Sequence, residues 1–235
     1  MAEKAPLQTI ARLTGLAYLA IFALAIGANF AVIMPITGAG TPQQVLAELQ
    51  AQEGAFRMAV AALFLVLMAD LTVSWGLYAI FAGRARELTL FTVLFRLAYT
   101  IGHIPVLLNL VAALRLSSPD AMAVLDEAGR AAWIQEYLVA HAHGFMLTLL
   151  FFGVHLVALG VLIWQTRAVP RAIAVLLVWA GAGYLADGFL WLVAPDLRSA
   201  IPGGGFFIVI LPALVGEGAL TVWLLVKGVK TDFRT

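Results

Sequence analysis

Six apolar runs, each longer than 20 residues, constrain what this chain can fold into more than any other feature of its sequence. A helix of about 20 apolar residues, rising about 1.5 Å per residue, crosses the hydrocarbon core of about 30 Å of a bilayer. Hydrophobic residues make up 63% of the chain and charged residues only 11%, so a water-soluble fold could not cover the apolar surface. We therefore predict an all-α, polytopic membrane bundle of six transmembrane helices that forms one integral membrane domain over residues 1–235. The predicted helices cover residues 10–34, 56–81, 88–114, 137–164, 170–193 and 206–226.

Basic residues are distributed unequally between the predicted loops. The cytoplasmic loops of membrane proteins collect Lys and Arg. Nine basic residues fall on the side that holds both termini and four fall on the other side, which predicts that both termini are cytoplasmic. The first group is Lys4, Arg12, Arg84, Arg86, Arg167, Arg171, Lys227, Lys230 and Arg234, and the second is Arg57, Arg115, Arg130 and Arg198.

The two long outer loops carry signals for short helices. Thr41 and Pro42 suit the N-cap and the first turn of a helix over residues 43–52. The segment from Ser118 to Gln135 has a similar pattern, with Asp120 in its first turn. We predict two short helices on the outer membrane face, either as plain connecting segments or as a lid over a site.

Several classes of function are excluded or disfavoured by what the sequence lacks. The chain has no cysteine, which excludes disulfides, thiolate metal sites and thiol nucleophiles. No basic run is typical of nucleic-acid binding, so the expected partners are the lipid bilayer and an unidentified small solute or ion, with no nucleic acid. The sequence contains no nucleophile-elbow, zinc-protease or P-loop motif, which favours a non-enzymatic role and leaves an intramembrane enzyme as the alternative.

Eight ionisable residues lie inside the predicted spans, away from their ends. A charged side chain at the centre of a membrane helix costs about 2.5 to 3.5 kcal/mol, so such groups are expected to face the protein interior and to find partners. Residues seven positions apart share a helix face, and on this basis several of the eight can point inward together. The eight residues are Asp70, Arg96, His103, His141, His143, His155, Asp187 and Glu217.

These residues define a hypothetical ligand or proton site. We expect Arg96 to pair with Asp70 or Glu217, and His155 to join them. Since three acids accompany one Arg, at least one carboxyl group must be protonated, hydrated, paired with His or matched by a bound cation. The alternative is that the charges only lock the helices together. The predicted site is Asp70, Arg96, His155, Asp187 and Glu217, with Arg57, Tyr99, His103 and Tyr184 as accessory residues.

The four histidines raise the possibility of a haem or a metal ion. His141 and His155 lie 14 positions apart on one helix face, about 21 Å along its axis. Paired haem ligation needs matching histidines on a second helix, and His103 alone lies outside this helix. No cofactor is therefore predicted, haem binding is disfavoured, and His141 with His143 stays an alternative metal pair.

Several ordered motifs along the chain resemble those of the bacterial membrane proteins grouped as the domain of unknown function family 4386. The likeness runs from about Ala11 to Lys230. The motifs are residues 56–57 (FR), 69–71 (ADL), 95–97 (FRL), 151–156 (FFGVHL), 183–187 (GYLAD) and 211–217 (LPALVGE). The resemblance implies a multi-pass protein of the bacterial cytoplasmic membrane. It also implies a shared polar pattern at Arg57, Asp70, Arg96, His155, Asp187 and Glu217, but no activity.

The sequence thus favours a membrane protein whose buried polar residues bind or move a small solute, an ion or a proton, with coupling through Glu217, Asp70 or His155. A structural or accessory membrane subunit is the first alternative, and a haem-binding electron carrier is the second.

Overall fold

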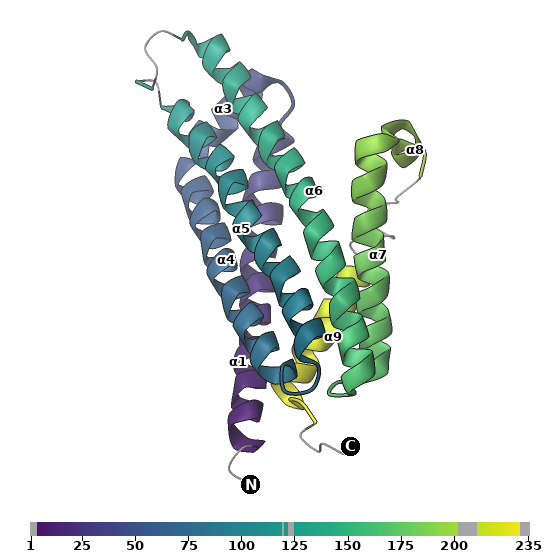
Figure 1. Ribbon diagram of the computed structural model, residues 1–235. Helices are drawn as coiled ribbons and strands as arrows, with labels where there is room; N and C mark the ends of the chain where they lie inside the picture. Colours follow the sequence, from purple (N-terminus) through teal and green to yellow (C-terminus); the bar gives the residue numbers. More distant parts are fainter. Residues whose placement is uncertain (1–3, 119, 122–124, 202–210, 231–235) are drawn as a thin grey trace. The chain divides into compact units, whose positions relative to one another are not determined.

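The computed structural model describes residues 4–118, 120–121, 125–201 and 211–230, and within these ranges every regular element is a helix. Figure 1 shows the helices in chain order, from purple α1 to yellow α9. The elements are α1 (Lys4–Ala28), the π-helical turn η1 (Asn29–Ile33), α2 (Met34–Thr37), α3 (Pro42–Ala51), α4 (Glu53–Phe81), α5 (Arg86–Ser117), α6 (Glu127–Thr166), α7 (Arg171–Val193), α8 (Pro195–Ser199) and α9 (Leu211–Val226).

The helices confirm the prediction of an all-α membrane bundle. In the described ranges, five helical segments are long and apolar enough to cross a bilayer, and α9 is a shorter apolar helix of 16 residues. The start of the sixth predicted span, residues 206–210, lies outside the described residues. Large apolar side chains such as Met58, Leu65 and Trp179 are exposed on these helices, as expected where lipid surrounds the protein.

The first predicted outer helix is confirmed as α3, and its start is fixed by the residues that predicted it. The backbone N–H of Thr41 donates to Gln44 Oε1 at 2.8 Å, and the backbone N–H of Gln44 donates to Thr41 Oγ1 at 3.4 Å. This reciprocal pair is a capping box, with Pro42 at the first helical position. Val45, Leu46 and Leu49 lie on the buried face of the helix.

The second outer segment differs from the prediction of a separate helix before Tyr137. Residues 119 and 122–124 lie outside the described residues, and from Glu127 onward the segment is part of α6, a continuous helix of 40 residues. Asp126 begins the helix by accepting a hydrogen bond from the Gly129 backbone N–H at 2.8 Å. The buried positions Ala131, Ile134 and Leu138 continue one apolar face through the expected boundary, which explains why the helix does not break.

One compact unit of the structure comprises residues 20–69 and 102–145. Its apolar core brings Leu46 and Leu49 of α3 together with Phe56, Leu110 and Ile134. Between α1 and α2, the turn η1 changes the spacing of buried residues: Ala28 and Ile33 are buried five positions apart, and Ile36 follows three positions later. A π-helical turn contains one more residue than an α-helical turn, which accounts for the longer first interval.

The other compact unit lies within residues 1–19, 70–101 and 146–235, of which residues 1–3, 202–210 and 231–235 are not described. Glycines allow its helices to approach closely. A Cβ atom at Gly181 of α7 would lie 2.6 Å from the backbone oxygen of Gly153 in α6, and one at Gly76 of α4 would collide with Thr14 of α1. Small residues serve this purpose in membrane helices generally, since lipid provides no hydrophobic drive for association.

This close contact predicts opposite effects of two glycine-to-alanine substitutions. Alanine is favoured over glycine by about 0.5 to 1 kcal/mol in a helix interior. We expect Gly27→Ala, where no atom lies within 4 Å of the added methyl group, to raise stability slightly. Gly181→Ala should instead lower it, because the methyl group meets the backbone of α6. Unfolding of both variants in mixed micelles, followed by circular dichroism, measures the difference; equal stabilisation by both would contradict the described packing.

Candidate functional site

A group of buried polar side chains lies around Arg96 in the unit that contains residues 70–101. We call it the Arg96 cluster. It consists of Tyr18 (α1), Asp70 (α4), Arg96 and Thr100 (α5), and His155 (α6), and each of these side chains is almost completely buried. The Arg96 guanidinium lies at its centre, and the residue is only 1% exposed. An arginine buried to this degree needs partners on several sides.

Asp70 is the ionic partner of Arg96. Arg96 Nη2 donates to Asp70 Oδ1, and the second carboxylate oxygen, Oδ2, accepts a hydrogen bond from the hydroxyl of Thr100. Of the two acids that the sequence offered to Arg96, the structure therefore pairs it with Asp70. Both oxygens of this carboxylate are engaged, so its charge is matched within the protein.

His155 contacts Arg96 through one ring nitrogen and the backbone through the other. Arg96 Nη1 lies 3.0 Å from His155 Nε2, and His155 Nδ1 lies 2.9 Å from the carbonyl oxygen of Thr92. A guanidinium can only donate and a carbonyl oxygen can only accept, so Nε2 accepts and Nδ1 carries the proton. The geometry thus assigns a neutral imidazole with a defined tautomer. Since both nitrogens are used, His155 has none left for a haem iron.

Aromatic rings surround the remaining sides of the guanidinium. Arg96 Cζ lies 5.0 Å from the centre of the Tyr18 ring and 5.4 Å from that of Phe152, both within the range of cation–π attraction. Nη1 also donates to the Tyr18 hydroxyl at 3.2 Å. Phe152 in turn contacts Tyr99 and Tyr184, with ring centres 4.9 and 5.7 Å apart, so two of the predicted accessory residues extend this aromatic wall.

One nitrogen of the guanidinium has no hydrogen-bond partner among the described residues. This atom is Arg96 Nε, which is buried. Buried donors are normally satisfied, and leaving one unpaired costs about 1 to 3 kcal/mol. A water molecule or an oxygen atom of a ligand would satisfy it.

Glu217 of α9 contributes a carboxyl group of a different kind. The residue is 8% exposed, and no described residue donates a hydrogen bond to its carboxylate. Its charge interacts with those of Arg96 and Asp70, and it also acts on Tyr18 and Tyr184, so it belongs to the same buried region. The backbone carbonyl of Glu217 accepts a hydrogen bond from the Thr221 hydroxyl at 2.8 Å. Among the described residues, Glu217 is therefore a buried acid whose carboxyl group has no direct partner.

The structure does not bring Asp187 into the Arg96 cluster. Asp187 forms a two-point ion pair with Arg198 of α8, with Arg198 Nε to Oδ1 at 2.8 Å and Nη2 to Oδ2 at 3.0 Å. This hydrogen bonding raises the pKa of Arg198 above its usual value. The predicted grouping of Asp187 with the other acids is thus corrected: its ionic partner is Arg198 in α8, the short helix that follows α7.

Two other predicted accessory residues have separate surroundings. Arg57 forms an exposed ion pair with Glu53 at 2.6 Å, one helical turn away in α4. His103 belongs to the other compact unit, where its ring centre lies 6.3 Å from that of His141 and 5.1 Å from that of Phe145. Among the described residues, no group of three or more His, Asp or Glu is arranged to hold a metal ion.

Sequence reasoning missed four residues that complete these contacts. Thr100 and Thr92 lie one turn after and one turn before Arg96 in α5, a spacing that signals a shared helix face. Tyr18 is the one tyrosine of α1, and Arg198 lies close behind a predicted span. The first two could have been found from the helical period, whereas the partners of Tyr18 and Arg198 depend on how the helices pack.

Comparison with known proteins identifies relatives without an assigned activity. The model of the family described as "Domain of unknown function (DUF4386)" matches residues 13–228. An uncharacterized protein of the archaeon Archaeoglobus fulgidus is 24% identical over 172 residues, which cover 73% of this chain and 84% of that protein. No solved structure matches the chain.

The ion pair predicts an asymmetry between single and double substitutions. Arg96→Ala leaves Asp70 buried without its cation and is expected to cost about 3 to 5 kcal/mol of unfolding free energy. Replacing both charges, as Arg96→Met with Asp70→Leu, should recover at least about half of this loss, since no buried charge is left unpaired.

The exposed pair of Arg57 with Glu53 provides the matched control. Arg57→Ala is expected to change stability by no more than about 1 kcal/mol. Equilibrium unfolding in mixed micelles gives all three values. A double variant no more stable than Arg96→Ala would show that the Arg96 cluster depends on more than charge balance.

Proposed function

The chain belongs to the DUF4386 family, and we propose that it binds and moves a small solute or ion across the bilayer, with Glu217 as the group that exchanges a proton. The observation that carries this proposal is the imbalance of charge around Arg96. One guanidinium is matched by Asp70, and Glu217 is a second acid in the same buried region, with no direct partner in the part of the chain that the structure describes.

The balance of charge identifies Glu217 rather than Asp70 as the exchangeable group. Asp70 already has contacts to Arg96 and Thr100 on its two oxygens. The tautomer assigned to His155 makes it neutral, so it supplies no second positive charge. An ionised Glu217 would therefore add an unmatched charge inside the bilayer, which is costly. A proton, a small metal cation or the cationic group of a solute would remove that cost.

Arg96 is proposed to help bind the ligand. It is held by Asp70, Tyr18 and His155, which come from three other helices, so its charge is fixed in position. Fixed charges favour binding because they need no rearrangement when a ligand arrives. Its unpaired Nε donor supports a ligand that offers an oxygen acceptor, such as water or a carbonyl or hydroxyl group. The class favoured is accordingly a small polar solute or cation, with aromatic side chains lining its surroundings.

A structural role is the competing proposal, and one observation favours it for part of the site. Arg96, Asp70, Tyr18 and His155 already satisfy most of one another's polar atoms, as expected of a group that holds helices together. This reading accounts for Arg96 and Asp70 but gives Glu217 no task. The two proposals therefore differ in what they expect from Glu217 alone.

Neutralising Glu217 is expected to abolish proton exchange while leaving the fold intact. Purified protein in liposomes that enclose a pH-sensitive dye is given a step in external pH, in potassium and then in sodium medium. We expect Glu217→Gln to reduce protein-dependent proton movement at least tenfold. Infrared difference spectra should also lose a carboxyl band that the unmodified protein shows on acidification.

Glu48→Gln is the matched control, because Glu48 lies on the exposed face of α3. It should retain both signals, and both variants should unfold like the original chain. If Glu217→Gln folds normally and still exchanges protons and titrates as before, the transport proposal is wrong and the structural role is favoured.

A further inference from the structure

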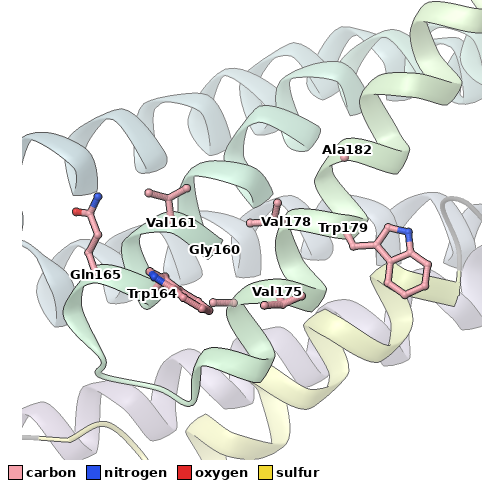
Figure 2. A pocket seen from close by; sticks show the side chains of 9 residues that line it. Gly160, Val161, Trp164, Gln165, Val175, Val178, Trp179 and Ala182 are labelled. Carbon is pink, nitrogen blue, oxygen red and sulfur yellow. The ribbon is translucent and has the colours of Figure 1, made fainter.

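We propose that the groove between α6 and α7 binds one acyl chain of an anionic phospholipid, whose headgroup is held by Arg171 at the end of the groove. This inference uses none of the residues of the Arg96 cluster and does not depend on the proposed transport. Figure 2 shows the side chains that line the groove.

The groove has a volume of about 390 Å³ and an almost entirely apolar lining. It lies between the last turns of α6 and the first half of α7. Figure 2 shows Val161 and Trp164 on one helix and Val178 and Trp179 on the other. The complete lining is Gly160, Val161, Trp164, Gln165, Ala174, Val175, Val178, Trp179 and Ala182. This size lies within the usual range for small-molecule sites, about 300 to 1,000 Å³.

Close helix packing forms the floor of the groove, and large side chains form its sides. A Cβ atom at Gly160 would lie 2.6 Å from Val178 Cγ2 and 2.7 Å from the Ala174 backbone oxygen, so the two helices nearly touch there. Trp164 and Trp179, in contrast, are about half exposed and stand away from the contact. In a bilayer the groove opens to lipid tails, and an apolar chain fills it without loss of any hydrogen bond.

A positive charge lies at one end of this apolar groove. Arg171 Cζ is 4.6 Å from the centre of the Trp164 ring, and Arg171 Nε donates to the Trp164 carbonyl oxygen at 3.4 Å. No carboxylate among the described residues forms an ion pair with Arg171. Its two terminal nitrogens are thus available for a phosphate group, which guanidinium binds by two parallel hydrogen bonds.

The surrounding sequence gives this end of the groove a net positive charge. Residues 160–186 include Arg167 and Arg171 but no Asp or Glu. Tryptophan next to arginine is typical of the level of lipid headgroups. The loop between α6 and α7 is predicted to be cytoplasmic, and the cytoplasmic leaflet carries the anionic lipids. Charge complementarity therefore selects an anionic phospholipid over a zwitterionic one.

The test measures which lipid the protein retains. The full chain is released from mixed micelles that contain equal amounts of phosphatidylglycerol and phosphatidylcholine with matched acyl chains, and bound lipids are counted by native mass spectrometry. We expect one retained phosphatidylglycerol with a preference of more than tenfold. Arg171→Gln should abolish the preference, whereas Arg86→Gln, which removes an exposed arginine at the start of α5, should leave it unchanged.

A second pair of variants tests the groove itself. Ala182→Phe fills the groove from the lining, and Ala186→Phe places the same side chain one turn further along α7, on an exposed position outside the lining. Only the first should lose the retained lipid. Equal retention of both lipids by the original chain, or the same retention by Ala182→Phe and Ala186→Phe, would overturn the proposal. So would a dimer that excludes lipid from this groove.

A second measurement uses conservative variants, which keep an aromatic ring at each altered position and so guard against variants that fail to fold. Phosphatidylglycerol with brominated acyl chains quenches nearby tryptophan fluorescence. We expect the quenching at low lipid ratios to fall by at least half in Trp179→Phe but to stay unchanged in Trp133→Phe, since Trp133 is exposed on the part of α6 outside the lining. Equal quenching in the two variants would contradict a specific site at the groove.

Discussion

The ion pair between Arg96 and Asp70 is the interaction on which the surrounding structure depends. Inside a bilayer neither charge can be left to water, so each must be matched by the protein. The match requires α4 to present Asp70 to α5, and the remaining donors of Arg96 then require Tyr18 from α1 and His155 from α6. Four helices are therefore tied to one another by the needs of a single guanidinium, while their apolar faces remain free to meet lipid.

The two buried acids near this guanidinium show how the same chemical group can have different roles. Asp70 accepts a hydrogen bond on each of its oxygens, whereas no described residue is a direct partner of the Glu217 carboxylate. Structural stability and proton exchange place opposite demands on a buried carboxyl group. A carboxylate with a matched charge stays ionised, whereas one without a matched charge can gain or lose a proton. Their separation onto two helices allows the protein to meet both demands.

Much of the fold and part of the site could be predicted from the sequence. Hydropathy located the helices, since only apolar stretches of this length can remain in lipid, and the helical period placed Arg96 and His155 on inward faces. The partner of Asp187 could not be predicted, because Arg198 reaches it only after the chain has turned through α8. The break expected before Tyr137 rested on hydropathy alone, and a helix in a long outer loop has no reason to end where the apolar run begins. Helix packing, which sequence does not display, decided the contacts of Tyr18.

The π-helical turn after α1 has a consequence for the evolution of chain length. Because the turn of Asn29–Ile33 accommodates one residue beyond the α-helical repeat, it restores Ile33 and Ile36 to the apolar core after an offset of one position. Without it, every later side chain of the helix would rotate by about 100°, the angle of one residue in a helix of about 3.6 residues per turn. A change of one residue in chain length at this point can thus be accommodated within the turn itself. The residues that follow, including α3 with its capping box, then keep their contacts with the apolar core.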